Sequence, residues 1–553
     1  MKVLCFDYIF GLLDWLKRKV INTFFIHLLL FSFFFQYNAF SEGTRELRPT
    51  QADHGYLQVH DPSAGTNRPF MSFEDLENSR LNVRICNIGE KVFMGFRMWR
   101  TNSLLYFRVK DPNGNTIPLP GMVSHPTYAN TYEVPRPVAS NNNTLGYIST
   151  YNRCIEGPRQ IVGGFNGYLA IEFTPTMTGD YYIEFNANDP INVVREKHAF
   201  REFDITVTTA ANVPILGRLW SKNWDVNLEG WTNEFKAIIY VYAKDSIVTS
   251  VNFNGMQPYS FNIAANSTGL FDTGDADFDR MSRIGNYSRP EYKLFLNDPD
   301  PACFPSGSFG SLTQPTTVTG CDPNNRCINV YSDKVGDVEI LLDLNGIEGY
   351  QTGTIDRIIR STVVPGHNCI TWDSRDGLGN YIPPGDNINL QVDYYNGLTH
   401  LALYDVEQHR NGYIIELVRP FPTTGIVRPA LFWDDSQITA GTADDGLVNL
   451  TGCDNGAAVG CHRWRNRGDN SCPWRNGIRE CPETINTWWY AQVIRDVAEY
   501  NLPDIYVNAN TNNPPGTRHD TTVCANTPPI QLNGGVTGGL TSTGVWSGAG
   551  TFV

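Results

Sequence analysis

The chain has 553 residues, with 43 lysines and arginines, 57 aspartates and glutamates and a formal net charge of −14 at pH 7. Nucleic-acid binding depends on clustered lysines and arginines, so this acidic chain is not expected to bind nucleic acid. Its 49 glycines, 33 prolines and 12% aromatic residues, arranged in many short alternating runs, predict an all-β protein. A chain of this length forms several domains, and we expect β-sandwich domains in tandem.

The amino-terminal region has the pattern of an export signal. Basic residues at 17–19 precede an apolar run at 20–35 that contains no formal charge. A membrane-spanning helix needs about 20 apolar residues, whereas a signal-peptide core needs fewer and follows positive charge. The small residue Ser41 favours cleavage before Glu42, so residues 1–41 are predicted to be a signal peptide. An uncleaved amino-terminal anchor is the alternative.

The cysteines agree with export. Beyond residue 41 they fall into groups of two, four and four, with Cys524 alone. Even numbers in each expected domain favour disulfides within domains and an oxidising compartment, and each group of four allows three pairings. The disulfide candidates are Cys86, Cys154, Cys303, Cys321, Cys327, Cys369, Cys453, Cys461, Cys472 and Cys481. A competing interpretation is a zinc site at Cys453, Cys461, His462 and Cys472.

Residues 42–209 are expected to form the first β-sandwich domain. The run LNVRIC at 81–86 alternates apolar and polar residues, and turn-forming residues follow it at 87–90. The segment TGDYYIEF at 178–185 resembles parts of immunoglobulin-like and jelly-roll modules from bacterial surfaces. Two packed sheets with alternating faces would bury the aromatic residues of this region, which favours a sandwich.

A second β-rich domain is expected over residues 210–301. Asp275, Asp277 and Asp279 form a candidate calcium site, because calcium prefers several hard oxygen ligands close together. Their spacing lacks the central glycine and the distal glutamate of an EF-hand loop. The alternative is a solvated loop without metal, and no other cofactor is expected.

The clearest expected sheet lies in residues 302–420. The run INLQVDY at 388–394 places apolar residues on one face, and the Asn-Gly pair at 396–397 is typical of a two-residue hairpin turn. The segment PGHNCITWDSRDGLGN at 365–380 resembles the GxHxxxWDGRDxxG turn of the immunoglobulin-like fold found in flagellar hook-capping proteins. The resemblance implies an immunoglobulin-like domain of around a hundred residues.

The same resemblance assigns structural roles to the residues of that turn. It implies that Trp372 covers the core, while Asp373, Arg375 and Asp376 hold the turn together. Ser374 stands where the motif has glycine, so the turn conformation is expected to differ locally. A Trp372 that faces a carbohydrate is the alternative, because aromatic rings also bind the apolar faces of sugars.

Residues 421–510 form a segment rich in cysteine and tryptophan, which indicates a disulfide-stapled insert. Its order of FWDDS, the cysteines and TINTWWY resembles a segment that precedes the repeats of gliding-motility surface adhesins. The run Trp488, Trp489 and Tyr490 is either an exposed binding patch or the buried floor of the insert. The floor is favoured because consecutive aromatic residues in a strand point to both faces.

The final stretch, 522–553, follows an expected polar linker at 511–521. Its pattern VCANTPPIQLNG followed by GVWSGAGTF is similar to the start of a β-repeat of the SprB-like gliding-motility adhesins, which Bacteroidota export by type IX secretion. We interpret this stretch as a truncated repeat. The resemblance implies that residues 1–521 lead into a longer surface filament.

No catalytic motif is found in the sequence, so the chain is not expected to be an enzyme. HExxH, GxSxG, P-loop and dinucleotide-binding patterns are absent, and the histidines are scattered. The resemblance implies a non-enzymatic, secreted cell-surface adhesin or motility-filament component. It implies as partners the secretion machinery, outer-membrane motility or attachment proteins, and surface polysaccharide. The alternative is a set of accessory glycan-binding modules of a secreted polysaccharide-acting enzyme.

Overall fold

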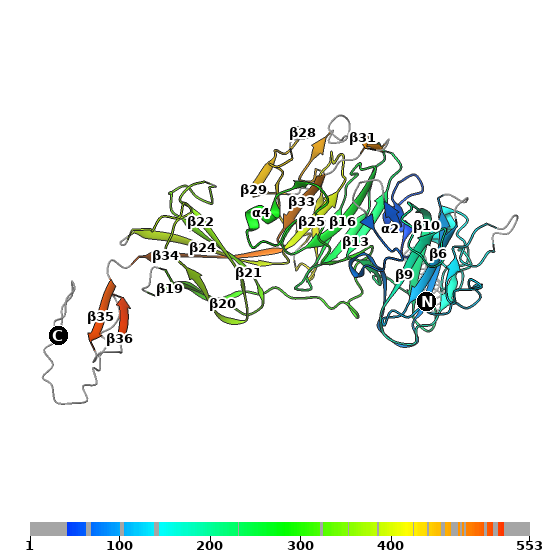
Figure 1. Ribbon diagram of the computed structural model, residues 1–553, viewed down its shortest axis with the longest axis horizontal. Helices are drawn as coiled ribbons and strands as arrows, with labels where there is room; N and C mark the ends of the chain where they lie inside the picture. The colour runs from blue at the N-terminus through cyan, green and yellow to red at the C-terminus, as the bar shows by residue number, and fades with distance from the viewer. Residues whose placement is uncertain are drawn as a thin grey trace, which may run out of the picture. The chain divides into compact units, whose positions relative to one another are not determined.

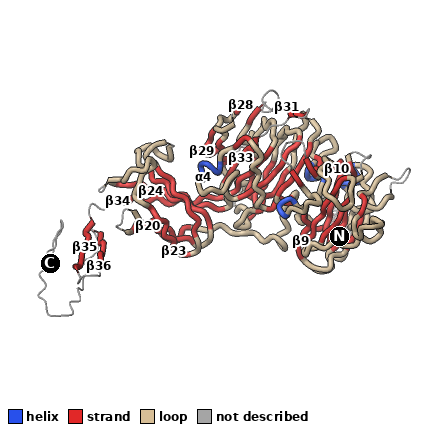
Figure 2. Tube along the Cα trace, in the orientation of Figure 1, coloured by secondary structure: helices blue, strands red, loops and turns tan. Residues whose placement is uncertain are grey.

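The computed structural model describes most of the chain between Ser41 and Cys524, whose regular structure is almost entirely antiparallel β-sheet with a few short helices (Figures 1 and 2). This confirms the predicted all-β class. The described ranges are 41–61, 68–99, 104–137, 143–230, 232–320, 324–351, 353–383, 386–423, 425–438, 442–454, 459–465, 474–475, 478–479, 483–502, 506–512 and 518–524. In these ranges no helix is long and apolar enough to cross a membrane.

Residues 1–40 of the expected signal peptide, and the GVWSGAGTF signature of the expected repeat, lie outside the described residues. The described chain divides into two compact units. The first unit extends to Ala237 and includes Phe295–Cys303; the second comprises Ile238–Leu294 and the chain from Phe304 onward.

The first unit contains two antiparallel groups of strands. One has the order β13-β1-β10-β5-β8, with β11 beside β10, and the other has the order β12-β4-β9-β6-β7. The strands of the first group are β1 (Tyr56–Gln58), β5 (Lys91–Met98), β8 (Ile171–Phe173), β10 (Ala199–Thr208), β11 (Pro214–Ile215) and β13 (Asn223–Asn227). Those of the second are β4 (Leu81–Ile85), β6 (Leu105–Lys110), β7 (Tyr132–Glu133), β9 (Gly179–Ala187) and β12 (Leu219–Ser221). The shorter elements are α2 (Thr44–Leu47), β2 (His60–Asp61), β3 (Arg68–Pro69), η1 (Glu77–Ser79) and α3 (Tyr151–Ile155).

Aromatic side chains join the two groups of strands into a sandwich-like core. The ring of Phe96 on β5 lies 5.7 Å from that of Phe107 on β6 and 5.3 Å from that of Phe185 on β9. Phe200 on β10 lies 4.8 Å from Phe185. All four rings are buried, so the alternating faces that the sequence predicts do meet across this core.

The boundary expected at residues 209–210 lies inside the first unit. Strand β12 pairs with β4 and strand β13 pairs with β1, so the chain after residue 210 completes both groups of strands. The segment Phe295–Cys303 also belongs to this unit. These pairings join residues far apart in sequence, and local alternation carries no information about them.

The second unit contains a sheet whose described strands run in the order β29-β27-β33-β25-β16, with β17 beside β33. Strands β14, β15 and β26 form a further antiparallel group. The strands of the sheet are β16 (Ser260–Asn266), β17 (Arg283–Ile284), β25 (Thr399–Tyr404), β27 (Leu431–Asp434), β29 (Val448–Cys453) and β33 (Glu483–Trp489). The further group comprises β14 (Ile238–Tyr242), β15 (Val248–Asn252) and β26 (Ile414–Arg419). The remaining elements between residues 238 and 479 are α4 (Ala276–Arg280), β18 (Lys293–Phe295), β28 (Thr442–Ala443), β30 (Trp464–Arg465), β31 (Trp474–Arg475) and β32 (Ile478–Arg479).

Two smaller sheets enclose a second core in the same unit. Their orders are β19-β20-β23 and β22-β21-β24-β34. Between them lie the buried side chains of Trp372, Ile388, Leu390, Val392 and Tyr394, so the predicted apolar face of 388–394 is confirmed. The strands are β19 (Leu312–Thr319), β20 (Arg326–Ser332), β21 (Gly336–Asp343), β22 (Arg357–Val363), β23 (Gly366–Trp372), β24 (Asn387–Asn396) and β34 (Gln492–Asn501).

Strand β34 closes this smaller body although it lies far beyond the expected domain end at residue 420. It pairs with β24 over ten positions, from Asn387 opposite Asn501 to Asn396 opposite Gln492. Strand β25, which follows β24, and strand β33, which precedes β34, pair with each other over six positions. The expected boundary at 420 therefore does not separate folded bodies.

The expected hairpin at 396–397 is wrong. Strand β24 belongs to the four-stranded sheet with β21 and β34, while β25 pairs with β16 and β33. The turn therefore passes the chain from one sheet to another. Gly397 has the positive φ of 66° that favours an Asn-Gly pair, and its N–H donates to Asp245 Oδ2 at 2.6 Å. Turn chemistry was predicted correctly, but the strand partners were not.

Three disulfides are present among the described residues: Cys86–Cys303, Cys327–Cys369 and Cys453–Cys461. The first corrects the expected grouping, because Cys86 bonds across 217 residues and Cys154 is a buried free thiol. Burial raises the pKa of the Cys154 thiol well above its ordinary value. The candidates Cys321, Cys472 and Cys481 lie outside the described residues.

The expected linker at 511–521 is also corrected in its described part. Strands β35 (Tyr506–Asn512) and β36 (Arg518–Cys524) form an antiparallel pair that covers most of that range. The sequence there is polar and contains two prolines, which favoured a linker. The β-branched residues Thr521, Thr522 and Val523 before Cys524 are the strand signal in this segment.

Candidate binding groove

An open polar groove of about 410 Å³ lies in the second unit, beside helix α4 and the start of strand β22. Its volume is within the range of ligand sites, and its walls combine acidic, basic and hydroxyl groups. The lining residues are Gly274, Asp275, Ala276, Asp277, Tyr350, Gly353, Thr354, Asp356, Arg357, Ile358, Arg360 and Gly377.

Asp356 holds the loop that forms one wall of the groove. Its buried carboxylate accepts hydrogen bonds from the backbone N–H groups of Leu344 at 2.9 Å and Gln351 at 3.2 Å. It also accepts from the side chains of Asn345 at 2.6 Å and Thr354 at 3.2 Å. With these donors around it, the carboxylate holds the loop in its conformation.

Arg360 gives the groove its central positive charge. Its guanidinium donates to Glu339 Oε2 at 2.7 Å and lies 3.3 Å from Asp277 Oδ1. Burial opposes the charge of Arg360, but the carboxylates of Glu339 and Asp277 outweigh burial and raise its pKa. Arg280 lies 3.7 Å from the same Glu339, so two guanidinium groups share one acid.

Arg357 connects the groove to the predicted Trp-Asp turn. Its guanidinium bonds to Asp373 and donates to the carbonyl of Arg375 at 2.9 Å. The indole N–H of Trp372 donates to the same carbonyl at 3.2 Å, and the indole is buried in the core. The motif residues therefore stabilise the turn, as the resemblance implies, and Trp372 does not face a ligand. Asp376 accepts from the N–H groups at 378 and 380.

The candidate calcium ligands do not come together. Asp275 caps the first turn of α4, Asp277 pairs with Arg360, and buried Asp279 accepts from Thr273 and Gly274. Within the described ranges, no group of three histidine, cysteine, aspartate or glutamate residues is placed to hold a metal ion. Asp275 and Asp279 bond within their own loop, while Asp277 pairs with Arg360 on β22; burial of Asp279 also differs from the solvated loop that was the alternative.

The aromatic run at 488–490 is not an exposed patch. Trp488, Trp489 and Tyr490 are all buried. Tyr490 stacks on Tyr395 with ring centroids 3.7 Å apart, and Arg280 lies over the Trp488 ring at 5.4 Å. The run is the apolar floor that the sequence favoured, and the alternative of a binding patch is wrong.

The zinc interpretation of the Cys-rich segment is also wrong for its described members. Cys453 and Cys461 form a disulfide, and Cys472 lies outside the described residues. The buried His462 has both ring nitrogens in use, with Thr487 Oγ1 at 2.6 Å and Asp435 Oδ2 at 3.2 Å. Its ring also stacks on Trp433 at 4.6 Å.

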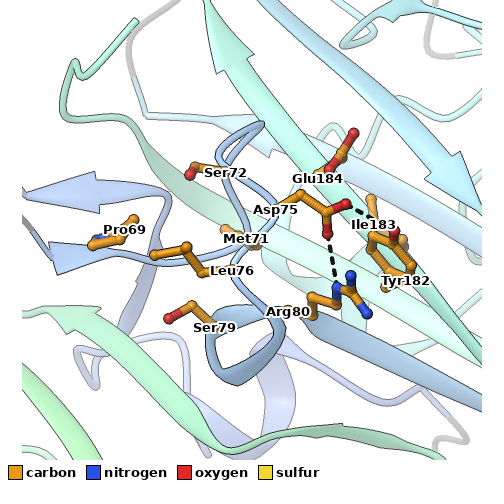
Figure 3. Close-up of a pocket in the computed structure, with 10 residues that line it drawn as sticks. All are labelled: Pro69, Met71, Ser72, Asp75, Leu76, Ser79, Arg80, Tyr182, Ile183 and Glu184. Atoms are coloured by element: carbon orange, nitrogen blue, oxygen red, sulfur yellow. Dashed lines mark hydrogen bonds and ion pairs between the residues drawn. The ribbon is translucent and has the colours of Figure 1, made fainter. Parts of the chain in front are cut away.

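A charged cluster in the first unit resembles a site but is closed (Figure 3). Asp75 accepts from Arg80 Nε at 2.7 Å, Tyr182 Oη at 3.1 Å and Lys110 Nζ at 3.2 Å. Burial opposes the charge of Asp75, but Arg80 and Lys110 outweigh it and lower its pKa. The space between these side chains does not admit a water molecule, so the cluster is structural.

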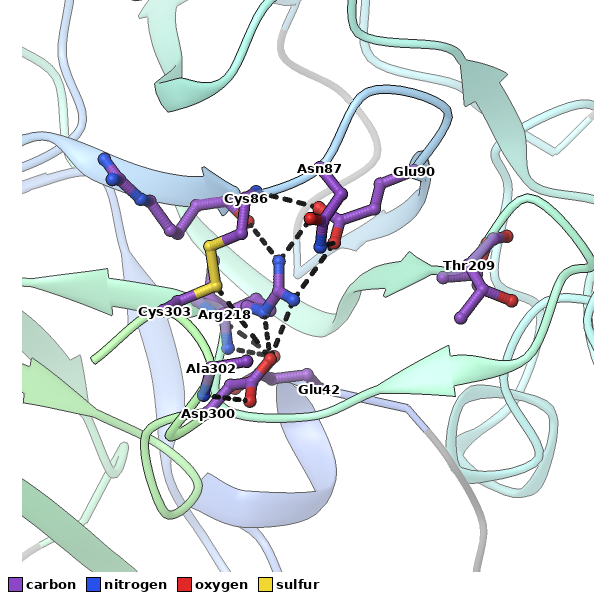
Figure 4. A network of polar contacts seen from close by, with 12 residues as sticks. Glu42, Cys86, Asn87, Glu90, Thr209, Arg218, Asp300, Ala302 and Cys303 are labelled. Atoms are coloured by element: carbon purple, nitrogen blue, oxygen red, sulfur yellow. Dashed lines mark hydrogen bonds and ion pairs between the residues drawn. A yellow bond between two sulfur atoms is a disulfide. The ribbon is translucent and has the colours of Figure 1, made fainter. Parts of the chain in front are cut away.

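Arg218 is the centre of a buried network that the sequence did not predict (Figure 4). Its guanidinium donates to both carboxylate oxygens of Glu90, at 2.9 and 3.1 Å, and to Asp300 Oδ2 at 2.7 Å. The disulfide between Cys86 and Cys303 lies next to this network, because Cys303 follows Asp300 and the Cys86 N–H donates to Glu90 at 2.9 Å. The disulfide and the ion pairs together fix the segment 295–303 to the first unit.

Two fully buried carboxylates of the first unit have strongly raised pKa values. Burial and the nearby charge of Glu46 raise the pKa of Glu42 to about 8. Burial raises the pKa of Asp204 to about 7, although hydrogen bonds from Thr206 and Tyr168 oppose the rise. No sequence pattern marked these residues, because acidic side chains are rarely buried.

These two carboxyl groups predict that the stability of the first unit depends on pH. The prediction applies to the chain in which the Ser41–Glu42 peptide bond is intact. The folded state retains protons that the unfolded state releases, because both folded pKa values lie above the ordinary values of 4.5 and 3.8. The stability that these two carboxyl groups contribute is therefore fully present below about pH 4, and it decreases as pH rises towards 8. Thermal unfolding is expected to give a lower Tm at pH 8 than at pH 5, with a smaller difference in a Glu42→Gln variant. An equal slope in both proteins would contradict the assignment to Glu42.

Comparison with known proteins gives no family. No family model matches the chain, and no curated protein matches it. Among solved structures, a DUF4785 family protein from Legionella pneumophila is similar at 11% sequence identity and a TM-score of 0.13. The match covers 65% of this chain and 87% of that protein. A likeness at this TM-score carries no argument about function.

Proposed function

We propose that the chain is a non-enzymatic, exported cell-surface adhesin or gliding-motility filament component. The observation that carries the proposal is the set of disulfides, above all Cys86–Cys303, in an all-β chain. Disulfides persist in oxidising compartments, which favours a location outside the cell. By its resemblance to SprB-like adhesins, the chain would use type IX secretion and would contact outer-membrane motility or attachment proteins and surface polysaccharide.

The strand connections of the second unit suit a protein that carries load. Strand β34 continues from β33 after residues 490–491, and β33 is a buried strand paired with both β25 and β27. Ladder hydrogen bonds lie perpendicular to antiparallel strands, so a pull along β34 would load the bonds of β33 together. An adhesin stalk must resist this kind of force.

An attachment assay tests the proposal. Deleting the coding region from the source organism is expected to reduce attachment or gliding on polysaccharide-coated surfaces, and the full chain supplied in trans is expected to restore it. Unchanged attachment and gliding in the deletion strain would contradict the adhesin function. The secreted medium should show no new polysaccharide-degrading activity when the chain is overproduced.

The open groove favours a second candidate function, that of an accessory glycan-binding module. Arg357 and Arg360 offer guanidinium donors, and Tyr350 and Thr354 offer hydroxyl groups, which together suit an acidic saccharide. A glycan array compares the unchanged chain with Arg360→Ala. The control is Arg495→Ala, which removes an exposed arginine paired with Asp393 outside the groove. Binding that Arg360→Ala abolishes and Arg495→Ala retains would support this candidate, and equal effects would reject it.

A further inference from the structure

The backbone nitrogen of Glu42 faces a buried carboxylate. Its N–H donates to Asp204 Oδ1 at 3.1 Å, and both residues are fully buried in the first unit. This nitrogen belongs to the peptide bond between Ser41 and Glu42, where the sequence predicts removal of the signal peptide. The predicted cleavage position therefore lies in the folded core, against an acidic side chain.

Asp204 has no basic partner among the described residues. Its oxygens accept hydrogen bonds from Thr206 Oγ1 and Tyr168 Oη, each at 2.7 Å, in addition to the Glu42 N–H. The ionisable groups that interact with it include Tyr168, Glu46 and the Cys154 thiol, and none of these three supplies positive charge. A buried carboxylate without a cation is costly, which agrees with the raised pKa of Asp204, and a positive charge placed here would stabilise its ionised form.

The backbone around Glu42 is held in place. The Glu42 carboxylate accepts from the N–H groups of Gly217 at 3.1 Å and Arg218 at 3.2 Å. The Gly43 N–H donates to Glu46 at 2.7 Å, and a Cβ atom at position 43 would lie 2.5 Å from the carbonyl oxygen of Phe203. Only glycine fits there, so the nitrogen of residue 42 keeps its place beside Asp204.

We propose that hydrolysis of the Ser41–Glu42 peptide bond creates the mature amino terminus and that the new α-ammonium group of Glu42 binds Asp204 as a buried ion pair. An export peptidase would catalyse the hydrolysis. The oxygen of one water molecule goes to the Ser41 carbonyl carbon, giving a carboxylate, and both water protons end on the Glu42 nitrogen. The inference rests on the proposed export of the chain.

Cleavage changes the charge at this position without disturbing its geometry. The amide of Glu42 offers one proton and no charge, whereas an ammonium group offers three protons and a positive charge. Ser41 is buried, and its hydroxyl has no hydrogen-bond partner in the described structure, so its removal breaks no side-chain hydrogen bond. Processing would thus stabilise the first unit, and the unprocessed chain would be the less stable form.

Thermal unfolding of two full-length forms tests the proposal. One form begins at Glu42 with a free amine and ends at Val553, and the other is identical except that acetylated Phe40-Ser41 precedes Glu42. The free-amine form is expected to unfold at a temperature at least about 4 °C higher at pH 7. Asp204→Asn in both forms is expected to remove most of this difference, whereas the control Asp189→Asn, at a partly exposed position, retains it. Equal unfolding temperatures of the two unsubstituted forms would overturn the proposal.

Amine labelling provides a measurement that does not depend on folding of the Asp204 variant. An amine-reactive reagent at pH 7 is expected to modify the Glu42 amine at least about tenfold more slowly in the native free-amine form than in denaturant. Labelling at the denatured rate would overturn the buried ion pair. Closure of the amine and the Glu42 side chain into a lactam, seen as the loss of one water by mass spectrometry, would also overturn it. Both measurements use purified protein, so their failure leaves the export proposal standing.

Discussion

Replacing Arg218 with alanine is expected to reduce the free energy of unfolding of the first unit by about 3–5 kcal/mol. Only 2% of the Arg218 side chain is exposed, and it neutralises Glu90 and Asp300 together. Its removal leaves two carboxylates beside each other with no cation, and it also removes a donor to the carbonyl of Arg84 at 3.1 Å. Thermal and urea unfolding of the purified chain measure the change.

The control for this prediction is Arg195→Ala. Arg195 also forms a bidentate pair, with Glu74 at 2.9 and 3.2 Å, but 57% of its side chain is exposed. Exposed ion pairs contribute little, so this variant is expected to unfold with the unchanged protein. An Arg218→Ala protein as stable as Arg195→Ala would show that the Arg218 network does not support the fold.

Removing the Cys86–Cys303 disulfide is the second change with a large expected effect. The double variant Cys86→Ser and Cys303→Ser is expected to lose about 2–5 kcal/mol, because the bond closes a loop of 217 residues in the unfolded chain. Reduction of the unchanged protein also breaks Cys327–Cys369 and Cys453–Cys461, so it should lower the unfolding temperature at least as much as the double substitution does. The variant itself should then respond less to reductant.

The short disulfide provides the matched comparison. Cys453 and Cys461 are only eight residues apart, so their bond restricts the unfolded chain less than Cys86–Cys303 does, and the double variant Cys453→Ser and Cys461→Ser should lose less stability. If both double variants lost the same stability, loop closure would not explain the effect. If neither double variant lost stability, the two disulfides would not stabilise the folded protein.

Local pattern was sufficient to predict the class and parts of the core. The alternation at 388–394 correctly identified the buried face of β24, and the turn motif correctly assigned Trp372 to the core. Consecutive aromatic residues at 488–490 correctly indicated a buried floor. These predictions depend on side-chain periodicity within one strand, which the sequence displays directly.

Partners distant in sequence were not predictable. Asn396–Gly397 had the chemistry of a hairpin turn, yet β24 and β25 enter different sheets because β34 and β33 return to pair with them from about a hundred residues away. Cys86 likewise bonds to Cys303 instead of a cysteine nearer in sequence. Strand pairing at such distances depends on the whole fold. A short stretch of a single sequence therefore does not show which distant strand it pairs with.

The candidate sites differ from the sequence predictions for a related reason. Arg218, Glu42 and Asp204 belong to residue types that normally face water, so nothing marked them as buried. The groove combines α4 with a loop near residue 356, which are well separated in the chain. The aspartates of the calcium candidate are close in sequence, but their carboxylates do not converge, because capping, hydrogen bonding and ion pairing use them separately.

Export to the cell surface is the central claim, and labelling of intact cells tests it most directly. Antibodies raised against the purified chain would be applied to unpermeabilised cells of the source organism, with a cytoplasmic protein as the control for lysis. The account predicts labelling of intact cells that a mild external protease removes. Labelling that appears only after permeabilisation, together with the cytoplasmic control, would contradict it.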